Sequence, residues 1–193
     1  QIRLMEKLKN HHGKNSMLVL RPAEAKETTV AWKMAMENTA TPTALIFSRQ
    51  NITDLPEGND YSLAERGAYI VAGSDENPDV VMVASGSEVS TLISGANLLR
   101  KDGVRCRIVS VPSEGLFRSQ PKEYQESVVP AGAKVFGMTA GLPVNLQGFL
   151  VGAAPESKIW GLESFGFSAP YKVLDEKLGY TGENVYAQVK AML

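Results

Sequence analysis

The chain of 193 residues is 44% hydrophobic and 21% charged, a balance typical of a globular protein with a sizeable core. Twenty Lys and Arg against 21 Asp and Glu leave a net charge of −1, so no overall basic field exists to hold nucleic acid or an anionic membrane surface. The longest apolar runs, such as Val80–Ala84, are far shorter than the roughly 20 residues that span a bilayer. The single cysteine, Cys106, excludes an internal disulfide and a Cys-rich zinc site, which is typical of a cytoplasmic protein. From the charge and the short apolar runs we expect binding to neither nucleic acid nor membrane.

The sequence pattern over residues 1–60 predicts only part of an α/β domain. The chain opens at Gln1 without an initiator Met or a signal pattern, so we expect the natural N-terminus to lie upstream. Buried strands are predicted at residues 17–20 and 43–47, with an amphipathic helix over residues 23–37 between them. Residues 48–60 are polar, contain Pro and Gly, and show no regular period, which indicates a linker and a domain boundary near residue 60.

Residues 61–193 predict a complete domain. Strands are expected at residues 67–72, 80–84, 104–108, 134–137 and 158–161, with a turn at residues 75–78. Alternation with Arg105 and Arg107 predicts that the third of these strands has one wetter face. The strand–helix–strand order over residues 80–110 is the crossover that builds a parallel sheet.

The helices of this domain are predicted from their caps. Ser85 is expected to cap a helix that ends at Gly103, with Glu88 in the capping-box position. Another helix is predicted over residues 145–152, and two more follow near the C-terminus, separated at Gly179. The expected fold is an α/β three-layer sandwich with a mainly parallel sheet (residues 61–193), preceded by a partial α/β domain (residues 1–60).

Three features invite a chemical interpretation, and each has a plainer one. The Ser85–Glu88 turn could cradle a phosphate at a helix N-terminus, but it lacks both phosphate-loop and dinucleotide fingerprints, which favours a capped structural helix. His11 and His12 are adjacent and have no Cys or further His nearby, so we predict a solvated pair and no metal site. Cys106 lies in an alternating strand and is predicted to pack as a small apolar side chain.

Arg49 is the strongest candidate for ligand binding. It follows a buried strand in the polar stretch Ser48-Arg49-Gln50-Asn51, at the carboxyl end of a strand, where α/β sheets tend to place ligands. A guanidinium there can make bidentate, charge-assisted hydrogen bonds to a phosphate. A surface salt bridge is the alternative interpretation.

Several segments carry a family resemblance. They are residues 21–23 (RPA) with Glu27 and residues 31–32 (AW), 42–51 (PTALIFSRQN), 84–89 (ASGSEV), 109–113 (VSVPS) and 165–170 (FGFSAP). In order and spacing they resemble the end of the pyrimidine-binding domain and the whole C-terminal domain of transketolases.

The resemblance implies a parent activity. Transketolases are homodimers that use thiamine diphosphate with Mg²⁺ or Ca²⁺ to move a two-carbon ketol unit between sugar phosphates in the pentose phosphate pathway. Residue by residue, only Arg49 matches a functional position, the arginine that contacts the substrate phosphate. The GDG…N motif, the cofactor-activating glutamate and the substrate-binding histidines of the family are absent from these residues, so no catalytic, cofactor or metal residue is assigned. We expect the chain alone to be inactive, to bind no cofactor, and to contribute structural and dimer contacts.

The chain also departs from the family pattern. Phe167 and the stretch Met138-Thr139-Ala140-Gly141 stand where many members carry an acidic residue, which argues against a polar or regulatory role for those turns. Two alternatives remain open. One is another thiamine-dependent enzyme, such as a deoxyxylulose-phosphate synthase or a keto-acid dehydrogenase β-subunit, against which Arg49 argues. The other is a free-standing α/β ligand-binding or interaction module that uses the Ser85–Glu88 turn.

Overall fold

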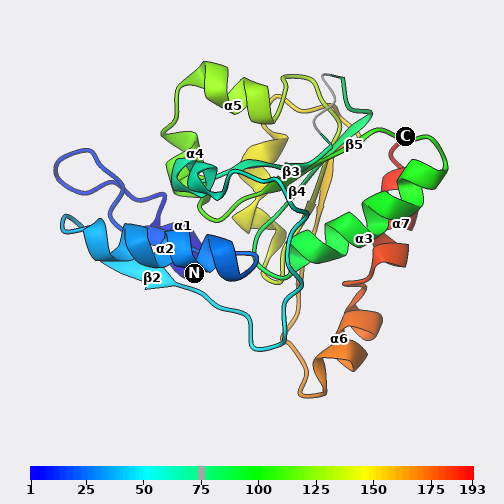
Figure 1. Cartoon of the computed structure of the whole chain (residues 1–193), viewed down its shortest axis with the longest axis horizontal. Helices are drawn as coiled ribbons and strands as arrows, with labels where there is room; N and C mark the ends of the chain where they lie inside the picture. The colour runs from blue at the N-terminus through cyan, green and yellow to red at the C-terminus, as the bar shows by residue number, and fades with distance from the viewer. Residues whose placement is uncertain (74–76) are drawn as a thin grey trace.

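The computed structural model describes residues 1–73 and 77–193 and contains two separate sheets, seen in Figure 1. The larger sheet has the strand order β3-β5-β4-β6-β7 and the smaller one pairs β1 with β2. Within the described residues, no helix combines the length and the apolar character needed to cross a bilayer.

The larger sheet is parallel except at one edge. Its strands are β3 (Tyr69–Ala72), β4 (Val80–Ala84), β5 (Cys106–Ser110), β6 (Val135–Met138) and β7 (Lys158–Trp160). Strands β5, β4, β6 and β7 run parallel, whereas β3 pairs antiparallel with β5. All five predicted strands are therefore confirmed, and part of the predicted turn, residues 75 and 76, lies outside the described residues.

Helices cover both faces of this sheet, which confirms the three-layer sandwich. On one face lie α3 (Glu88–Lys101) and α7 (Gly182–Lys190), which pack on alternate strand residues such as Met82 and Ile108. The other face is covered by α4 (Glu114–Arg118), α5 (Lys122–Val128) and the 3₁₀ turn η3 (Gln147–Leu150). Because β4 is central, its residues alternate between the two cores and all five are buried.

Three local expectations were wrong. The helix after β4 begins two residues later than predicted: its N-cap is Ser87, and the Ser85 hydroxyl instead accepts a hydrogen bond from Arg3. Strand β5 has no wet face, because the Arg107 guanidinium is buried and donates to two carbonyls of the α5 C-terminus. The predicted helix over residues 145–152 is a pair of 3₁₀ turns, η2 (Pro143–Asn145) and η3.

The N-terminal part forms a small layer of its own. It contains α1 (Ile2–Met5), β1 (Leu18–Leu20), α2 (Ala25–Glu37) and β2 (Thr43–Leu45), and the two strands are parallel. Beyond β2, residues 46–60 contain no helix or strand, and the 3₁₀ helix η1 (Tyr61–Arg66) leads into β3.

The predicted break at Gly179 separates α6 (Tyr171–Leu178) from α7. Gly179 adopts the left-handed conformation with φ of 77°, which ends α6. No residue of α6 is buried, and Figure 1 shows this helix standing away from the sheet at the end of a long loop. The loop and helix, residues 163–178, are called the C-terminal arm below.

Candidate functional site

Arg49 lies on an exposed segment that joins the small layer to the larger domain. Its side chain is exposed, and within residues 1–73 and 77–193 it makes no hydrogen bond or ion pair. The ladder of β1 and β2 continues for one residue, since the Ile46 amide donates to the Leu20 carbonyl over 2.9 Å. Arg49 therefore lies just beyond the carboxyl end of a parallel strand pair, and its guanidinium is free to bind an external anion.

The Arg49 segment, residues 47–52, is held at both ends. On one side, the Phe47 ring contacts the Trp32 ring of α2 with centroids 6.2 Å apart. On the other side, Leu55 is buried in the core that contains α3 and α7. Thr53 and Asp54 line a groove of about 570 Å³ together with residues of α3, including Ser90 and Ser94. The segment thus bridges the small layer and α3.

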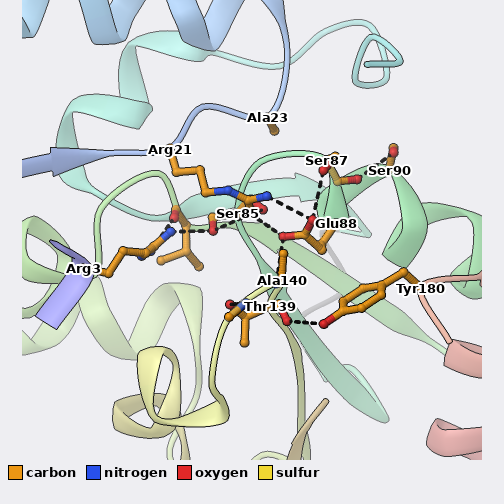
Figure 2. A network of polar contacts seen from close by, with 12 residues as sticks. Arg3, Arg21, Ala23, Ser85, Ser87, Glu88, Ser90, Thr139, Ala140 and Tyr180 are labelled. Carbon is orange, nitrogen blue, oxygen red and sulfur yellow. Dashed lines mark hydrogen bonds and ion pairs between the residues drawn. The ribbon is translucent and has the colours of Figure 1, made fainter. Parts of the chain in front are cut away.

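The Ser85–Glu88 turn is filled by Arg21, as Figure 2 shows. The Arg21 guanidinium, which follows β1 directly, pairs with both carboxylate oxygens of Glu88 and donates to the Ser85 carbonyl. Gly86 has a φ of +64°, and a Cβ there would lie 2.5 Å from Arg21 Cζ, so only glycine fits. Because a side chain of the chain itself occupies this turn, the turn is not a phosphate cradle.

Glu88 extends the network to the end of β6. Its Oε2 accepts a hydrogen bond from the Ala140 amide at 3.3 Å, and its Oε1 accepts from the Ser87 hydroxyl at 2.9 Å. One residue before Ala140, the Thr139 carbonyl accepts a 2.8 Å hydrogen bond from the Tyr180 hydroxyl. Burial raises the pKa of Tyr180 to about 12, so this hydroxyl remains a donor at physiological pH.

Helix α1 supplies a second buried arginine to the same turn. Arg3 Nη1 donates to Ser85 Oγ over 2.6 Å, and burial lowers the pKa of Arg3 although Glu6 opposes that shift. Glu6 is also buried, and its Oε2 accepts from the Ser113 hydroxyl at 3.0 Å. Burial raises the pKa of Glu6, with Arg3 acting against it. Arg3 and Glu6 thus attach the N-terminal helix to the segments that follow β4 and β5.

A third buried contact joins α2 to β3. The Tyr69 hydroxyl donates to Glu27 Oε1 over 2.7 Å, and the Ala23 amide donates to Glu27 Oε2 over 2.7 Å. Burial is the main cause that raises the pKa of Glu27, and burial also raises the pKa of Tyr69. These buried polar groups, together with the apolar contacts of Ala23 and Val30 with the core under α3 and α7, fasten the N-terminal part to the larger domain. This junction is called the joint below.

The other residues singled out in the sequence do not join this site. His11 and His12 are exposed at the tip of an N-terminal loop, as predicted. Cys106 is buried, and burial raises the pKa of its thiol to about 11, in keeping with a packing role. Among the residues that the structure describes, no three His, Cys, Asp or Glu side chains gather where they could hold a metal ion.

Sequence reasoning proposed Arg49 as a ligand-binding residue, which stays a prediction, and missed the buried polar network. The Arg21–Glu88, Arg3–Ser85 and Glu27–Tyr69 contacts join residues at least 42 positions apart. A periodic pattern carries no information about such pairs. One local signal is Gly86, whose small size permits the close approach of Arg21.

The fold and this joint define a three-layer α/β domain of mainly parallel topology to which a short parallel strand pair is fastened. Residues 67–181 match the family described as the transketolase-like TK C-terminal domain. The chain belongs to the transketolase family.

Curated relatives agree with this assignment. A transketolase of Staphylococcus aureus is 40% identical over 180 residues, which are 92% of this chain and 27% of that protein. A transketolase of Halalkalibacterium halodurans is 34% identical over 194 residues, covering 98% of this chain and 28% of that protein. The chain thus spans about a quarter of the length of the curated relatives that it matches.

Solved structures show the same fold. Transketolase from Leishmania mexicana has a TM-score of 0.80 and 34% identity, with 94% of this chain and 26% of that chain covered. A Pichia stipitis transketolase in complex with sedoheptulose 7-phosphate has a TM-score of 0.81 and 30% identity, with the same coverage. A split gene transketolase, described as an inactive beta4 tetramer, has a TM-score of 0.72 at 22% identity and covers 99% of this chain and 60% of that one. At that identity the last likeness concerns the fold alone.

Proposed function

We propose that this chain is the C-terminal part of a transketolase, an enzyme that uses thiamine diphosphate to transfer a two-carbon ketol unit between sugar phosphates. The observation that carries the proposal is the 40% identity to a transketolase over 92% of the chain, together with the SRQN segment around Arg49. The two curated relatives described above are transketolases, which favours this family over a deoxyxylulose-phosphate synthase or a keto-acid dehydrogenase.

Within that enzyme, Arg49 binds the phosphate group of the sugar. Its support is the unpaired, exposed guanidinium beyond the carboxyl end of β2. A Pichia stipitis relative was solved with sedoheptulose 7-phosphate and another with xylulose 5-phosphate, so sugar phosphates bind to proteins of this family. A free arginine in a polar segment suits such a ligand because it can bond two phosphate oxygens at once.

The chain divides near residue 60 into the end of a pyrimidine-binding domain and a C-terminal domain. The support for this boundary is the stretch without helix or strand at residues 46–60, and the family match that begins at residue 67. The buried polar contacts described above then lie between two domains of the enzyme and hold them in one relative placement.

Thiamine diphosphate and its Mg²⁺ or Ca²⁺ are held by other parts of the enzyme. The described side chains do not fit this group: no cluster of three metal-ligating side chains exists among them, and Arg21 fills the glycine turn before α3. The contribution of this chain is consequently to bind and position the sugar substrate, and no chemical step is assigned to its residues.

The enzyme is a homodimer in the cytoplasm. Dimer formation is supported by apolar side chains on the C-terminal arm, where Phe165 is 98% and Phe167 67% exposed, because large exposed apolar patches mark protein–protein contacts. The cytoplasmic location is supported by the single, buried Cys106.

Substitution of Arg49 in the complete enzyme tests the proposal. We expect Arg49→Ala to raise KM for phosphorylated sugars by about tenfold or more, as the loss of a charge-assisted contact predicts, and to leave KM for unphosphorylated acceptors unchanged. Arg49→Lys keeps the charge and should have an intermediate effect. Lys101→Ala, which removes an exposed cation at the end of α3, serves as the matched control. Equal losses with phosphorylated and unphosphorylated acceptors would show that Arg49 does not bind phosphate.

A further inference from the structure

The Arg49 segment begins and ends on opposite sides of one ion pair. At its start, Ile46 is hydrogen-bonded to Leu20, the neighbour of Arg21 in the chain. Beyond its end, Thr53 and Asp54 lie along α3, the helix whose first residue is Glu88. The Arg21–Glu88 pair therefore links the two supports between which the segment is suspended.

The pair is built to hold a single geometry. Both guanidinium Nη atoms of Arg21 bind the Glu88 carboxylate, and the two side chains are only 13% and 6% exposed. The backbone of Arg21 is fixed as well, since its amide donates to the Pro112 carbonyl at 2.9 Å and its carbonyl accepts from the Gly86 amide at 3.2 Å. A planar, bidentate, largely buried pair restricts both distance and orientation, unlike an exposed surface pair.

Other contacts across the joint do not have this placement. The Tyr69–Glu27 hydrogen bond connects β3 to the start of α2, and the Ser113–Glu6 hydrogen bond connects α4 to the N-terminal helix. Neither one touches α3 or the end of β1. Arg3 does reach Ser85, just before α3, but it comes from α1 and not from β1. None of these contacts therefore sets the span between β1 and α3 that the Arg49 segment must bridge. Figure 2 shows the Arg21 guanidinium reaching the Glu88 carboxylate between Ser85 and Ser87, in the turn that leads into α3.

We propose that Arg21 and Glu88 are positioning residues for Arg49: their ion pair fixes the distance between β1 and α3 and thereby places the Arg49 guanidinium for the substrate phosphate. The inference rests on the proposed function of Arg49. When the pair is lost, the segment retains its sequence and its charge, but Arg49 samples a wider range of positions. Ordering it on a phosphate then costs affinity, which appears in KM for phosphorylated sugars and not in turnover at saturation.

A double-mutant cycle in the complete enzyme tests this role. The variants are Glu88→Gln, Arg49→Ala and the two combined, measured with a phosphorylated sugar and with its unphosphorylated analogue. We expect Glu88→Gln to raise KM for the phosphorylated sugar about fivefold, a fraction of the loss from removing Arg49 itself, with kcat unchanged. In the Arg49→Ala background the same substitution should raise KM no further. Asp79→Asn, which breaks the exposed Asp79–Arg105 pair at the opposite end of β4, should leave every constant unchanged.

The outcomes separate the two proposals. If Glu88→Gln and Arg49→Ala act additively, or if Glu88→Gln weakens both substrates equally, Glu88 is structural only and the positioning role is wrong. If Arg49→Ala itself has no effect specific to phosphorylated sugars, the proposed function of Arg49 is wrong, and the positioning role falls with it. If Glu88→Gln does not fold, Arg21→Lys is the second variant, because lysine retains the charge but not the bidentate contact. We again expect KM to rise for phosphorylated sugars only.

Discussion

Glu27 shows what a single buried carboxyl does to the pH dependence of this chain. Its two oxygens accept hydrogen bonds from Tyr69 and from the Ala23 amide, yet burial outweighs both and raises its pKa above the usual value of 4.5. The folded state therefore keeps a proton that the unfolded chain has already lost. Stability from this group is present below pH 4.5 and is lost as the pH rises toward the raised pKa.

We predict that Glu27→Gln flattens the fall in unfolding free energy above pH 4.5. A full difference of one bound proton corresponds to a decline of about 1.4 kcal/mol for each pH unit, which an amide cannot show. Urea unfolding at several pH values measures the slope. The slope is the readout, because the hydrogen bond lost from the Ala23 amide lowers stability equally at every pH. The exposed Glu57→Gln is the control, and an unchanged slope in Glu27→Gln would show that this carboxyl is ionised in the folded state.

At the scale of single elements, apolar periodicity predicted the sheet well and the helix ends poorly. Val80–Ala84 is apolar throughout because both of its faces are covered, and its sequence alone indicates a central strand. In β5 the same reasoning was wrong about Arg107, which was predicted to lie on a solvent-exposed face. A charged residue in an alternating strand normally faces water, but here the carbonyls at the end of α5 receive its guanidinium, and this contact exists only after the layers have packed.

Ser85 illustrates a second kind of element-scale error. A serine three residues before a glutamate fits a capping box, and Glu88 does stand in the first turn of α3. The serine hydroxyl is instead used by Arg3, from a helix 82 positions earlier, and Glu88 is used by Arg21. Local capping rules fail here because two distant arginines, and not backbone amides of the helix, bind the Ser85 hydroxyl and the Glu88 carboxylate.

The C-terminal arm makes a prediction at this scale. Phe165 is 98% and Phe167 67% exposed, and Tyr171 and Val173 of α6 are about 40% exposed, so covering the arm with another surface would stabilise it. We predict that Phe165→Ser with Phe167→Ser shifts the complete enzyme from dimer toward monomer, as measured by analytical ultracentrifugation over a range of concentrations. Val151→Ser, another exposed apolar residue outside the arm, is the control. An unchanged dimer dissociation constant would exclude the arm from the dimer contact.

At the scale of the whole molecule, the chain combines a complete sheet with an incomplete one. The five-stranded sheet is covered on both faces, whereas the β1–β2 pair has two strands, and α2 leaves Trp32 and Met36 exposed. The family resemblance of the sequence predicted the division near residue 60 and the role of Arg49, and both remain predictions. It could not anticipate how the parts are joined, because the joint consists of side-chain pairs that are distant in sequence.

We predict that the isolated chain neither binds thiamine diphosphate with Mg²⁺ nor transfers a ketol unit. Among its described residues no three His, Cys, Asp or Glu side chains gather, and the glycine turn before α3 is filled by Arg21, so we expect the cofactor to be held by other parts of the enzyme. Isothermal titration calorimetry and a turnover assay with sugar phosphates are the measurements. The complete enzyme is the positive control, and heat of binding or turnover by the isolated chain would contradict the proposed division of labour.

The polar character of the joint bears on the fidelity of assembly. Two apolar surfaces can shift relative to each other at little cost, because one apolar contact replaces another. A misplaced Glu27, Glu88 or Arg3 would instead be buried without its partner. Each such error costs several kcal/mol, on the order of the whole stability of a domain. Incorrect docking of the N-terminal part is thus strongly disfavoured, and the correctly assembled form is the most stable one.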